Sequence, residues 1–133
     1  MAPHILVIDD QINLPRFIAM ELQSEGYQVS LYCDDELATI QELNPDLIVL
    51  NWELRRKLGF NIYRQLRSVD HQVPIVVITT EDECSCRLEL EMGVQTCLTK
   101  PFSMNDLIRA IEYHLIHEKL IHDKQSIECS VCN

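Results

Sequence analysis

The chain has 133 residues, 47% of them hydrophobic, and 21 acidic against 11 basic residues give it a formal net charge of −10. This length predicts a single domain with a buried core, and this composition excludes an intrinsically disordered chain. The net charge disfavours direct binding to nucleic acid or to an anionic membrane. Because no apolar run approaches the roughly 20 residues that span a bilayer and residues 1–4 lack the features of a secretory signal, we expect a cytoplasmic protein.

Residues 5–8 are the first apolar run and predict a strand that ends in Asp9 and Asp10. In the helix expected next, Asn13 or a neighbour is the cap, and Gly26 ends the helix. The side chains expected on the buried side of this helix are Phe17, Ile18, Met20 and Leu22.

Residues 27–33 predict a second strand, and a helix capped at residues 34–35 follows it. Residues 47–50 predict the third strand. This apolar run has a β-branched centre and no polar alternation, which is typical of a parallel strand that is covered on both faces. The strand ends in Asn51, and we expect the neighbouring Trp52 to be partly exposed.

A third helix is expected from Gly59 onwards, and residues 75–78 predict a fourth strand. Residues 81–92 predict a fourth helix, and residues 94–99 predict a weaker fifth strand. The last helix begins near Ser103, which resembles the first residue of a capping box.

The alternation of strands and helices predicts an α/β fold, in which right-handed crossovers wind a parallel sheet on both faces. We assign residues 1–120 to this domain. Residues 121–133 show no apolar periodicity, so we expect them to be a C-terminal tail or the start of a linker.

Polar residues gather at the carboxyl ends of the expected strands. They are Asp9, Asp10, Asn51, Thr79, Thr80 and Lys100. Each one alone is explained more simply as the polar end of a strand, but their joint arrival at one edge of the sheet favours a site. The turn after the first strand has two carboxylates and no glycine, which argues against a nucleotide-phosphate site. Paired carboxylates instead suit a hard cation such as Mg²⁺.

Four short motifs mark these strand ends. They are residues 7–11 (VIDDQ), 45–52 (PDLIVLNW), 74–80 (PIVVITT) and 98–102 (LTKPF). With these motifs, residues 4 to about 117 resemble the receiver domain of bacterial two-component response regulators. The resemblance implies a flavodoxin-like, doubly wound (βα)5 fold with five parallel strands in the order 2-1-3-4-5.

The resemblance also implies roles for the residues at the strand ends. In the family, a carboxylate in the position of Asn51 takes a phosphoryl group from a sensor histidine kinase. The family's Mg²⁺ ligands correspond to Asp9, Asp10 and the backbone carbonyl of Glu53.

Three further positions complete the implied site. The residue matching Thr79 hydrogen-bonds the phosphoryl group, and the lysine matching Lys100 offsets its charge. The peptide bond before Pro101 is expected to be cis, a geometry that is rare outside bonds to proline.

Asparagine at position 51 changes this chemistry. A neutral amide lacks the anionic oxygen that attacks phosphorus, so Asn51 is not expected to accept a phosphoryl group. Asp9 and Asp10 are then left with Lys100 as the charged residues of the pocket. We therefore expect no cofactor, or only weakly bound Mg²⁺, and no enzymatic activity.

Other positions also depart from the family pattern. Residues 54–58 lack the usual proline and glycine, Thr80 replaces a small apolar residue, and Cys97 replaces the aromatic residue that switches rotamer. These departures favour a naturally atypical receiver over an ordinary one with an engineered Asp-to-Asn change at position 51.

Positive charge is concentrated in one part of the sequence. This concentration consists of Arg55, Arg56, Lys57, Arg64 and Arg67. A solvated loop and helix face is the simpler explanation. The alternative hypothesis is that one of these side chains pairs with a carboxylate of the acidic pair in place of a metal ion.

The six cysteines are Cys33, Cys84, Cys86, Cys97, Cys129 and Cys132. In a cytoplasmic chain we expect thiols and not disulfides. The last two have the spacing of zinc and redox motifs, with His114, His117 and His122 upstream. Because a zinc site needs four ligands in tetrahedral reach, we favour incidental thiols.

Three functional hypotheses follow. The first is a phosphorylation-independent receiver domain that acts by protein contacts in signalling or transcription regulation, with a sensor kinase or an output domain as partner. A homodimer would use the face of the fourth helix, fifth strand and last helix. The second hypothesis is a phosphoacceptor displaced onto Glu53 or Asp10, and the third is a thiol-based sensor.

Overall fold

The computed structural model describes residues 2–32, 37–53, 59–69, 72–80 and 96–116. Several expected features lie outside these ranges. They are the caps at 34–35, the loop 54–58 with its basic run, the fourth helix at 81–92, the tail at 121–133, and every cysteine except Cys97.

A single sheet of five strands organises the chain, in the order β2-β1-β3-β4-β5. The strands are β1 (His4–Ile8), β2 (Gln28–Tyr32), β3 (Leu47–Asn51), β4 (Ile75–Thr79) and β5 (Thr96–Thr99). All neighbouring pairs are parallel. This order and direction confirm the flavodoxin-like, doubly wound fold.

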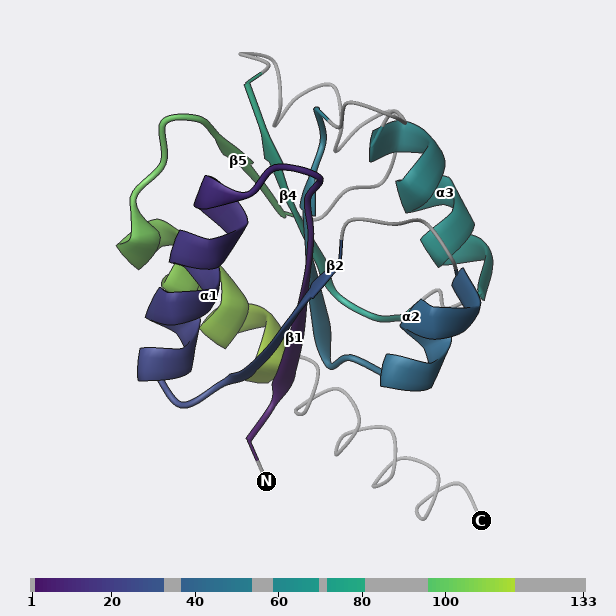
Figure 1. The fold of residues 1–133 in the computed structure, drawn as a ribbon, viewed down its shortest axis with the longest axis horizontal. Coiled ribbons are helices and arrows are strands. Elements are labelled where there is room, and N and C mark those ends of the chain that lie inside the picture. The colour runs from purple at the N-terminus through teal and green to yellow at the C-terminus, as the bar shows by residue number, and fades with distance from the viewer. Residues whose placement is uncertain (1, 33–36, 54–58, 70–71, 81–95, 117–133) are drawn as a thin grey trace, which may run out of the picture.

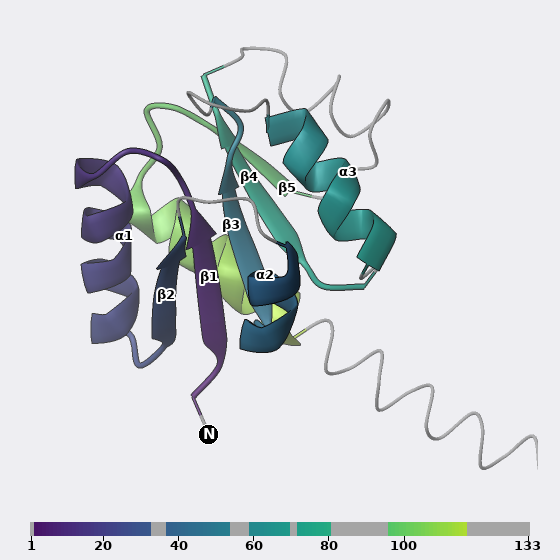
Figure 2. The ribbon, with the colours of Figure 1, turned by 45° about the vertical axis from the view of Figure 1, so that its right-hand side comes forward.

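Helices cover both faces of the sheet. They are α1 (Asn13–Ser24), α2 (Leu37–Leu43), α3 (Gly59–Val69) and a C-terminal helix at residues 104–116. Figure 1 shows α1 and the C-terminal helix on one face, with α2 and α3 on the other. The turned view in Figure 2 shows the same two layers around the strands.

The core consists of two apolar layers that the strands separate. Because successive strand residues point to opposite faces, Ile5 and Val7 pack with Ile18 of α1, whereas Leu6 and Ile8 pack on the other face. All five residues of β3 are buried, as are all five of β4. The continuous apolar runs in the sequence therefore correspond to strands covered on both sides.

Helix α1 begins and ends through its backbone. The N-cap is Ile12, the neighbour of Asn13, and it makes no side-chain cap bond, so Asn13 is the first residue of the helix and not its cap. At the other end, Gly26 has φ +97° and its N–H donates to the Gln23 carbonyl at 3.0 Å. The Tyr27 N–H donates to the Leu22 carbonyl at 3.2 Å, which completes a Schellman motif. Gly26 ends the helix as expected because it adopts this left-handed conformation without strain.

The buried side of α1 differs from the expected one. Phe17 and Met20 are 49% and 67% exposed, so their assignment to the core is wrong. The buried residues of α1 are Pro15, Ile18, Ala19 and Leu22. Their spacing follows one helical stripe, and residues 17 and 20 lie on the opposite, exposed side of the helix.

The C-terminal helix has a side-chain cap. The Ser103 hydroxyl accepts a hydrogen bond from the Asp106 N–H at 3.1 Å, and the Ser103 carbonyl accepts one from the Leu107 N–H at 3.2 Å. The serine half of the expected capping box is therefore present.

The edge of the sheet at which the strands begin, here called the amino edge, is tied together by His4. Its backbone N–H donates to Asp46 Oδ2 at 2.7 Å, and Nε2 lies 2.7 Å from Ser30 Oγ. Its Nδ1 lies 3.3 Å from the Leu43 carbonyl. Because a carbonyl can only accept, Nδ1 carries the proton and donates to it. These bonds join β1 to β2, to the last residue of α2 and to the segment between α2 and β3.

No helix within the described ranges combines the length and the apolar composition needed to cross a membrane.

Candidate functional site

The opposite edge of the sheet, here called the carboxyl edge, brings together polar residues predicted for the site. Asn51 ends β3 and pairs in register with Ile78, and Thr79 ends β4 and pairs with Thr99. Asp9 follows β1, and its N–H donates to the Tyr32 carbonyl at 3.0 Å. The parallel direction of the strands is the reason that these ends meet.

Asn51 is fixed at the centre of this edge. The side chain is only 3% exposed, and its Oδ1 accepts from Lys100 Nζ at 3.2 Å and from the Glu53 N–H at 3.3 Å. Its Nδ2 makes a long contact of 3.5 Å with the Glu53 carbonyl. The next residue also belongs to the sheet, because the Trp52 N–H donates to the Ile78 carbonyl at 2.8 Å. An uncharged amide oxygen with two hydrogen-bond donors therefore lies at the tip of β3.

The contact of the Glu53 side chain with β4 was not predicted from the sequence, where its carbonyl was expected as a metal ligand and its carboxylate only as a displaced phosphoacceptor. Its carboxylate accepts from Thr79 Oγ1 at 2.5 Å and from the Thr80 N–H at 2.5 Å. Thr79 is fully buried. The available signal was an acidic residue two positions after the end of a central strand, within reach of the neighbouring strand's polar tip.

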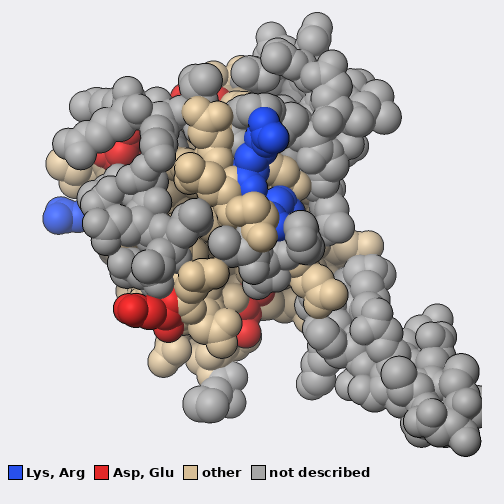
Figure 3. All heavy atoms as spheres, turned by 90° about the vertical axis from the view of Figure 1, so that its right-hand side faces the viewer, with Lys and Arg blue, Asp and Glu red and all other residues tan. Residues whose placement is uncertain are grey.

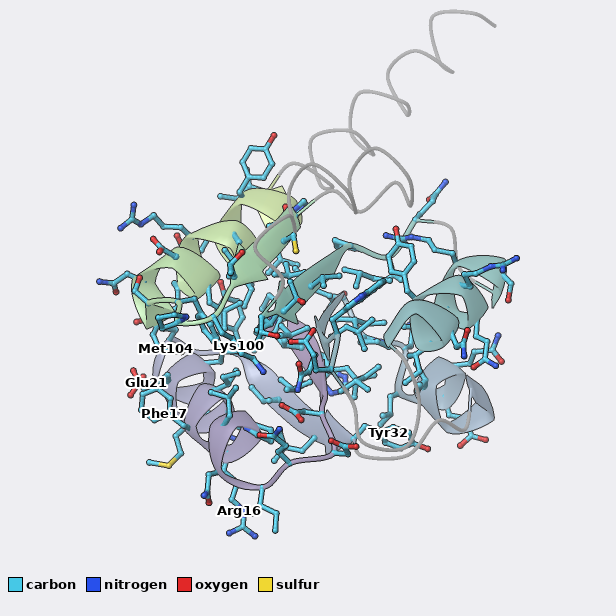
Figure 4. The ribbon with its side chains drawn as sticks, turned by 90° about the horizontal axis from the view of Figure 1, so that it is seen from above. Arg16, Phe17, Glu21, Tyr32, Lys100 and Met104 are labelled. Carbon is cyan, nitrogen blue, oxygen red and sulfur yellow. The ribbon has the colours of Figure 1, made fainter. Side chains whose placement is uncertain are left out.

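Lys100 reaches the site from the end of β5. Its N–H donates to the Thr79 carbonyl at 2.7 Å, and the Lys100–Pro101 peptide bond is cis. Figure 4 shows the Lys100 side chain over the strand ends, whereas Phe17, Glu21 and Met104 lie toward the rim. The lysine supplies positive charge at the centre of an otherwise acidic edge.

The acidic pair has its own arrangement. Asp9 is buried, and its Oδ1 accepts from the Gln11 N–H at 3.0 Å. Asp10 is half-buried, and its Oδ1 is shielded from solvent. These two carboxylates are hard oxygen donors of the kind that Mg²⁺ prefers.

The rest of the donor set fits Mg²⁺ poorly. Within the described part of the chain, no three His, Cys, Asp or Glu side chains are placed to hold one metal ion. The carboxylate of Glu53 is bonded to the end of β4, and Asn51 Oδ1 already accepts from the Lys100 ammonium. An amide oxygen shared with a cation is a weaker ligand than a carboxylate.

Cys97 forms a disulfide, which contradicts the expectation that this cysteine is a thiol. It is half-buried, pairs in register with Val77 of β4, and packs against the core layer under α3. The partner sulfur lies outside the described ranges. The expectation of a thiol at position 97 rested on a cytoplasmic location, and location alone does not determine whether a given cysteine forms a disulfide.

Trp52 is a core residue. It is 8% exposed, so the expected partial exposure is wrong, and its ring lies 6.2 Å from that of Tyr63. Tyr63 in turn lies 5.2 Å from the Arg67 guanidinium, which donates to the Val73 carbonyl at 2.6 Å. Val73 precedes β4, so Arg67 is engaged at the far end of the sheet from the acidic pair.

The remaining basic residues and the suggested zinc ligands are only partly described. Figure 3 shows blue side chains on the face of α3, which carries Arg64 and Arg67. His114 is buried, and its Nε2 is hydrogen-bonded with Thr96 Oγ1. This places His114 in the packing between the C-terminal helix and β5.

Comparison with known proteins agrees with this geometry. Residues 5–112 match the family described as response regulator receiver domain. Among solved structures, the receiver domain of the Francisella response regulator 1452 is 27% identical, with a TM-score of 0.78, over 86% of this chain and 98% of that one.

Two further structures are similar. NtrX from Brucella abortus is 26% identical with a TM-score of 0.85; the match covers 96% of this chain but 30% of NtrX. A CheY-like receiver domain protein from Methanospirillum hungatei JF-1 is 20% identical with a TM-score of 0.80, over 90% of this chain and 98% of that one, and this likeness concerns the fold alone.

Proposed function

The chain belongs to the response regulator receiver domain family, and from this membership we propose that it is a phosphorylation-independent receiver that signals through protein contacts. The observation that carries the proposal is the environment of Asn51. The residue is buried at the tip of β3, and both atoms of its amide face polar groups of the chain. In this proposal the chain binds other proteins and does not catalyse a reaction.

The chemical argument concerns the nucleophile. A carboxylate attacks phosphorus through an anionic oxygen, and an amide oxygen has no such charge to give. Lys100 reduces the electron density of Oδ1 further by donating to it at 3.2 Å. Asn51 is therefore held in a stable, unreactive arrangement.

Weak binding of Mg²⁺ is part of the proposal. Asp9 and Asp10 are the candidate ligands, with the Glu53 carbonyl as a third donor. That carbonyl faces the Asn51 amide at 3.5 Å, and the third carboxylate of an ordinary acceptor is replaced. Bound Mg²⁺ would supply charge neutralisation at this edge.

The partner surface proposed here is the face of β5 and the C-terminal helix, together with the expected fourth helix at 81–92. Tyr113 and Ile116 are exposed apolar residues of the C-terminal helix and support a protein contact there. The occupant is a sensor kinase, an output domain or a second copy of the chain. Because this chain spans 30% of NtrX, control of transcription through an output domain is proposed only for a longer protein.

Incubation with acetyl phosphate and Mg²⁺, followed by intact mass measurement, tests phosphorylation independence. We expect no phosphoryl adduct on the parent chain. The Asn51→Asp variant is the matched control, since it changes one amide to the carboxylate that the reaction needs, and it should gain one phosphoryl group.

A phosphoryl adduct on the parent chain would contradict the proposal. Peptide mapping of that adduct to Glu53 or Asp10 would support the displaced phosphoacceptor instead. Failure of the Asn51→Asp variant to react under the same conditions would show that the pocket, and not only residue 51, prevents phosphorylation.

A second candidate function, thiol-based sensing, is favoured by the disulfide at Cys97. Disulfides in reducing compartments are usually transient or redox-sensing. Its test is titration of free thiols in denatured protein, before and after reduction. The parent should gain more thiols on reduction than the Cys97→Ser variant does, and equal gains would count against this function.

A further inference from the structure

The ends of β3 and β4 are joined by a carboxylate of the chain itself. Glu53 Oε2 accepts from Thr79 Oγ1, and Oε1 accepts from the Thr80 N–H, each at 2.5 Å. Hydrogen bonds to a carboxylate are among the stronger ones in proteins. The two oxygens thus bind two donors that lie 26 and 27 residues away along the chain.

The backbone of Glu53 is held in place for this contact. The Glu53 N–H donates to Asn51 Oδ1 at 3.3 Å, and Asn51 is itself fixed by Lys100 Nζ. Because Asn51 is buried, this turn is anchored to the sheet. The carboxylate is therefore presented to β4 by a turn that is already ordered.

The groups around this carboxylate complement its negative charge. A hydroxyl and a backbone N–H are both donors, and Lys100 adds a positive charge at the same edge. Such a set of donors suits an anion with oxygen atoms. Each oxygen of the Glu53 carboxylate is engaged by one of these donors, Oε2 by the Thr79 hydroxyl and Oε1 by the Thr80 N–H.

We propose that Glu53 is an internal anionic ligand, which occupies an oxyanion site made by Thr79, Thr80 and Lys100 and holds the ends of β3 and β4 in one arrangement. The chemical class of external ligand that this site would accept is a small tetrahedral oxyanion, such as inorganic phosphate. The proposal deepens the phosphorylation-independent function and rests on it, because it names the group that replaces a bound phosphoryl group.

The test uses the Glu53→Ala and Glu53→Gln variants of the whole chain. Glu42→Gln is the matched control, since it removes one negative charge from an exposed position on α2. Amide ¹H–¹⁵N spectra are recorded during titration with inorganic phosphate, at constant ionic strength and without any phosphoryl donor.

Two results are expected. The Thr80 amide proton resonates downfield in the parent and in Glu42→Gln, and it moves upfield in both Glu53 variants because the short bond to a carboxylate is lost. Phosphate shifts the Thr79, Thr80 and Lys100 signals of both Glu53 variants, with an affinity about tenfold above that of the control, since the competing negative charge is gone.

A Thr80 resonance that does not move in either Glu53 variant overturns the proposal. Phosphate affinity equal to that of Glu42→Gln also overturns it. If Glu53→Ala does not fold, Glu53→Gln keeps the shape of the side chain and decides alone. Failure here is distinct from failure of the proposed function, which is judged by a covalent adduct on the parent chain in acetyl phosphate.

Discussion

The two edges of the sheet use similar polar residues in different ways. At the amino edge, His4, Ser30 and Asp46 bond to one another or to backbone groups, and the network joins strands whose positions the core already fixes. At the carboxyl edge, the bonds of Glu53 and Lys100 run from charged side chains to the tips of other strands. The polar residues of the amino edge therefore connect secondary-structure elements, whereas those of the carboxyl edge place charged groups at the strand ends.

This difference indicates which of the two edges should respond to a bound anion. Substitutions at the amino edge should lower the free energy of unfolding and leave anion binding unchanged. Substitutions at the carboxyl edge should change binding more than they change stability. Three stability measurements, from the largest expected effect to the smallest, test how strict that division is.

The largest effect is expected for His4→Ala. The change removes the imidazole bonds to Ser30 Oγ and to the Leu43 carbonyl in a half-buried position. Unsatisfied polar groups of this kind cost about 1–3 kcal/mol of unfolding free energy. Urea unfolding measures the loss, and phosphate titration of the same variant should match the parent. A variant as stable as the parent would show that the amino edge is not a structural network.

An intermediate effect is expected for Ser103→Ala at the start of the C-terminal helix. Loss of the hydroxyl that accepts from the Asp106 N–H should cost about 1 kcal/mol. Ser68→Ala is the matched control, because the Ser68 hydroxyl donates to the Gln65 carbonyl within α3 and caps nothing. Urea unfolding of both variants would contradict the capping role if their losses were equal.

The smallest effect is expected at Tyr27, close to the amino edge. Burial raises the pKa of its phenol above the ordinary value of 10.0, and the nearby Glu112 and Glu25 carboxylates raise it further. A raised folded-state pKa contributes stability that is complete below pH 10.0 and is lost as the pH rises through the folded value. Between about pH 9 and pH 11, the unfolding free energy of the parent should fall more than that of Tyr27→Phe. Parallel curves for the two proteins would rule this out.

The strands of the sheet could be predicted from the sequence because the apolar run that indicates each strand lies within a few consecutive residues. The apolar runs ending in Asp9, Asn51 and Thr79 correspond to β1, β3 and β4, and parallel winding then brings their ends to one edge. The polar residues of the carboxyl edge follow from that topology alone. No knowledge of rotamers was needed for this step.

What the sequence left open depends on tertiary partners. Glu53 has several rotamers, and its choice of Thr79 is set by the distance between two strand tips. Trp52 is buried because Tyr63 of α3 packs beside it, and Cys97 has a sulfur partner that spacing alone does not identify. Each of these features is a contact between elements that are distant in sequence.

The hydrogen bond from the Trp52 N–H to the Ile78 carbonyl has a consequence for the lifetime of the protein. Spontaneous deamidation of asparagine begins when the next backbone nitrogen attacks the side-chain carbonyl and closes a succinimide ring. Here that nitrogen is engaged in the sheet at 2.8 Å, and the Asn51 carbonyl oxygen is engaged by Lys100 at 3.2 Å. Ageing of the chain should therefore convert Asn51 to aspartate only slowly, so that old molecules keep the same chemical identity at the tip of β3 as new ones.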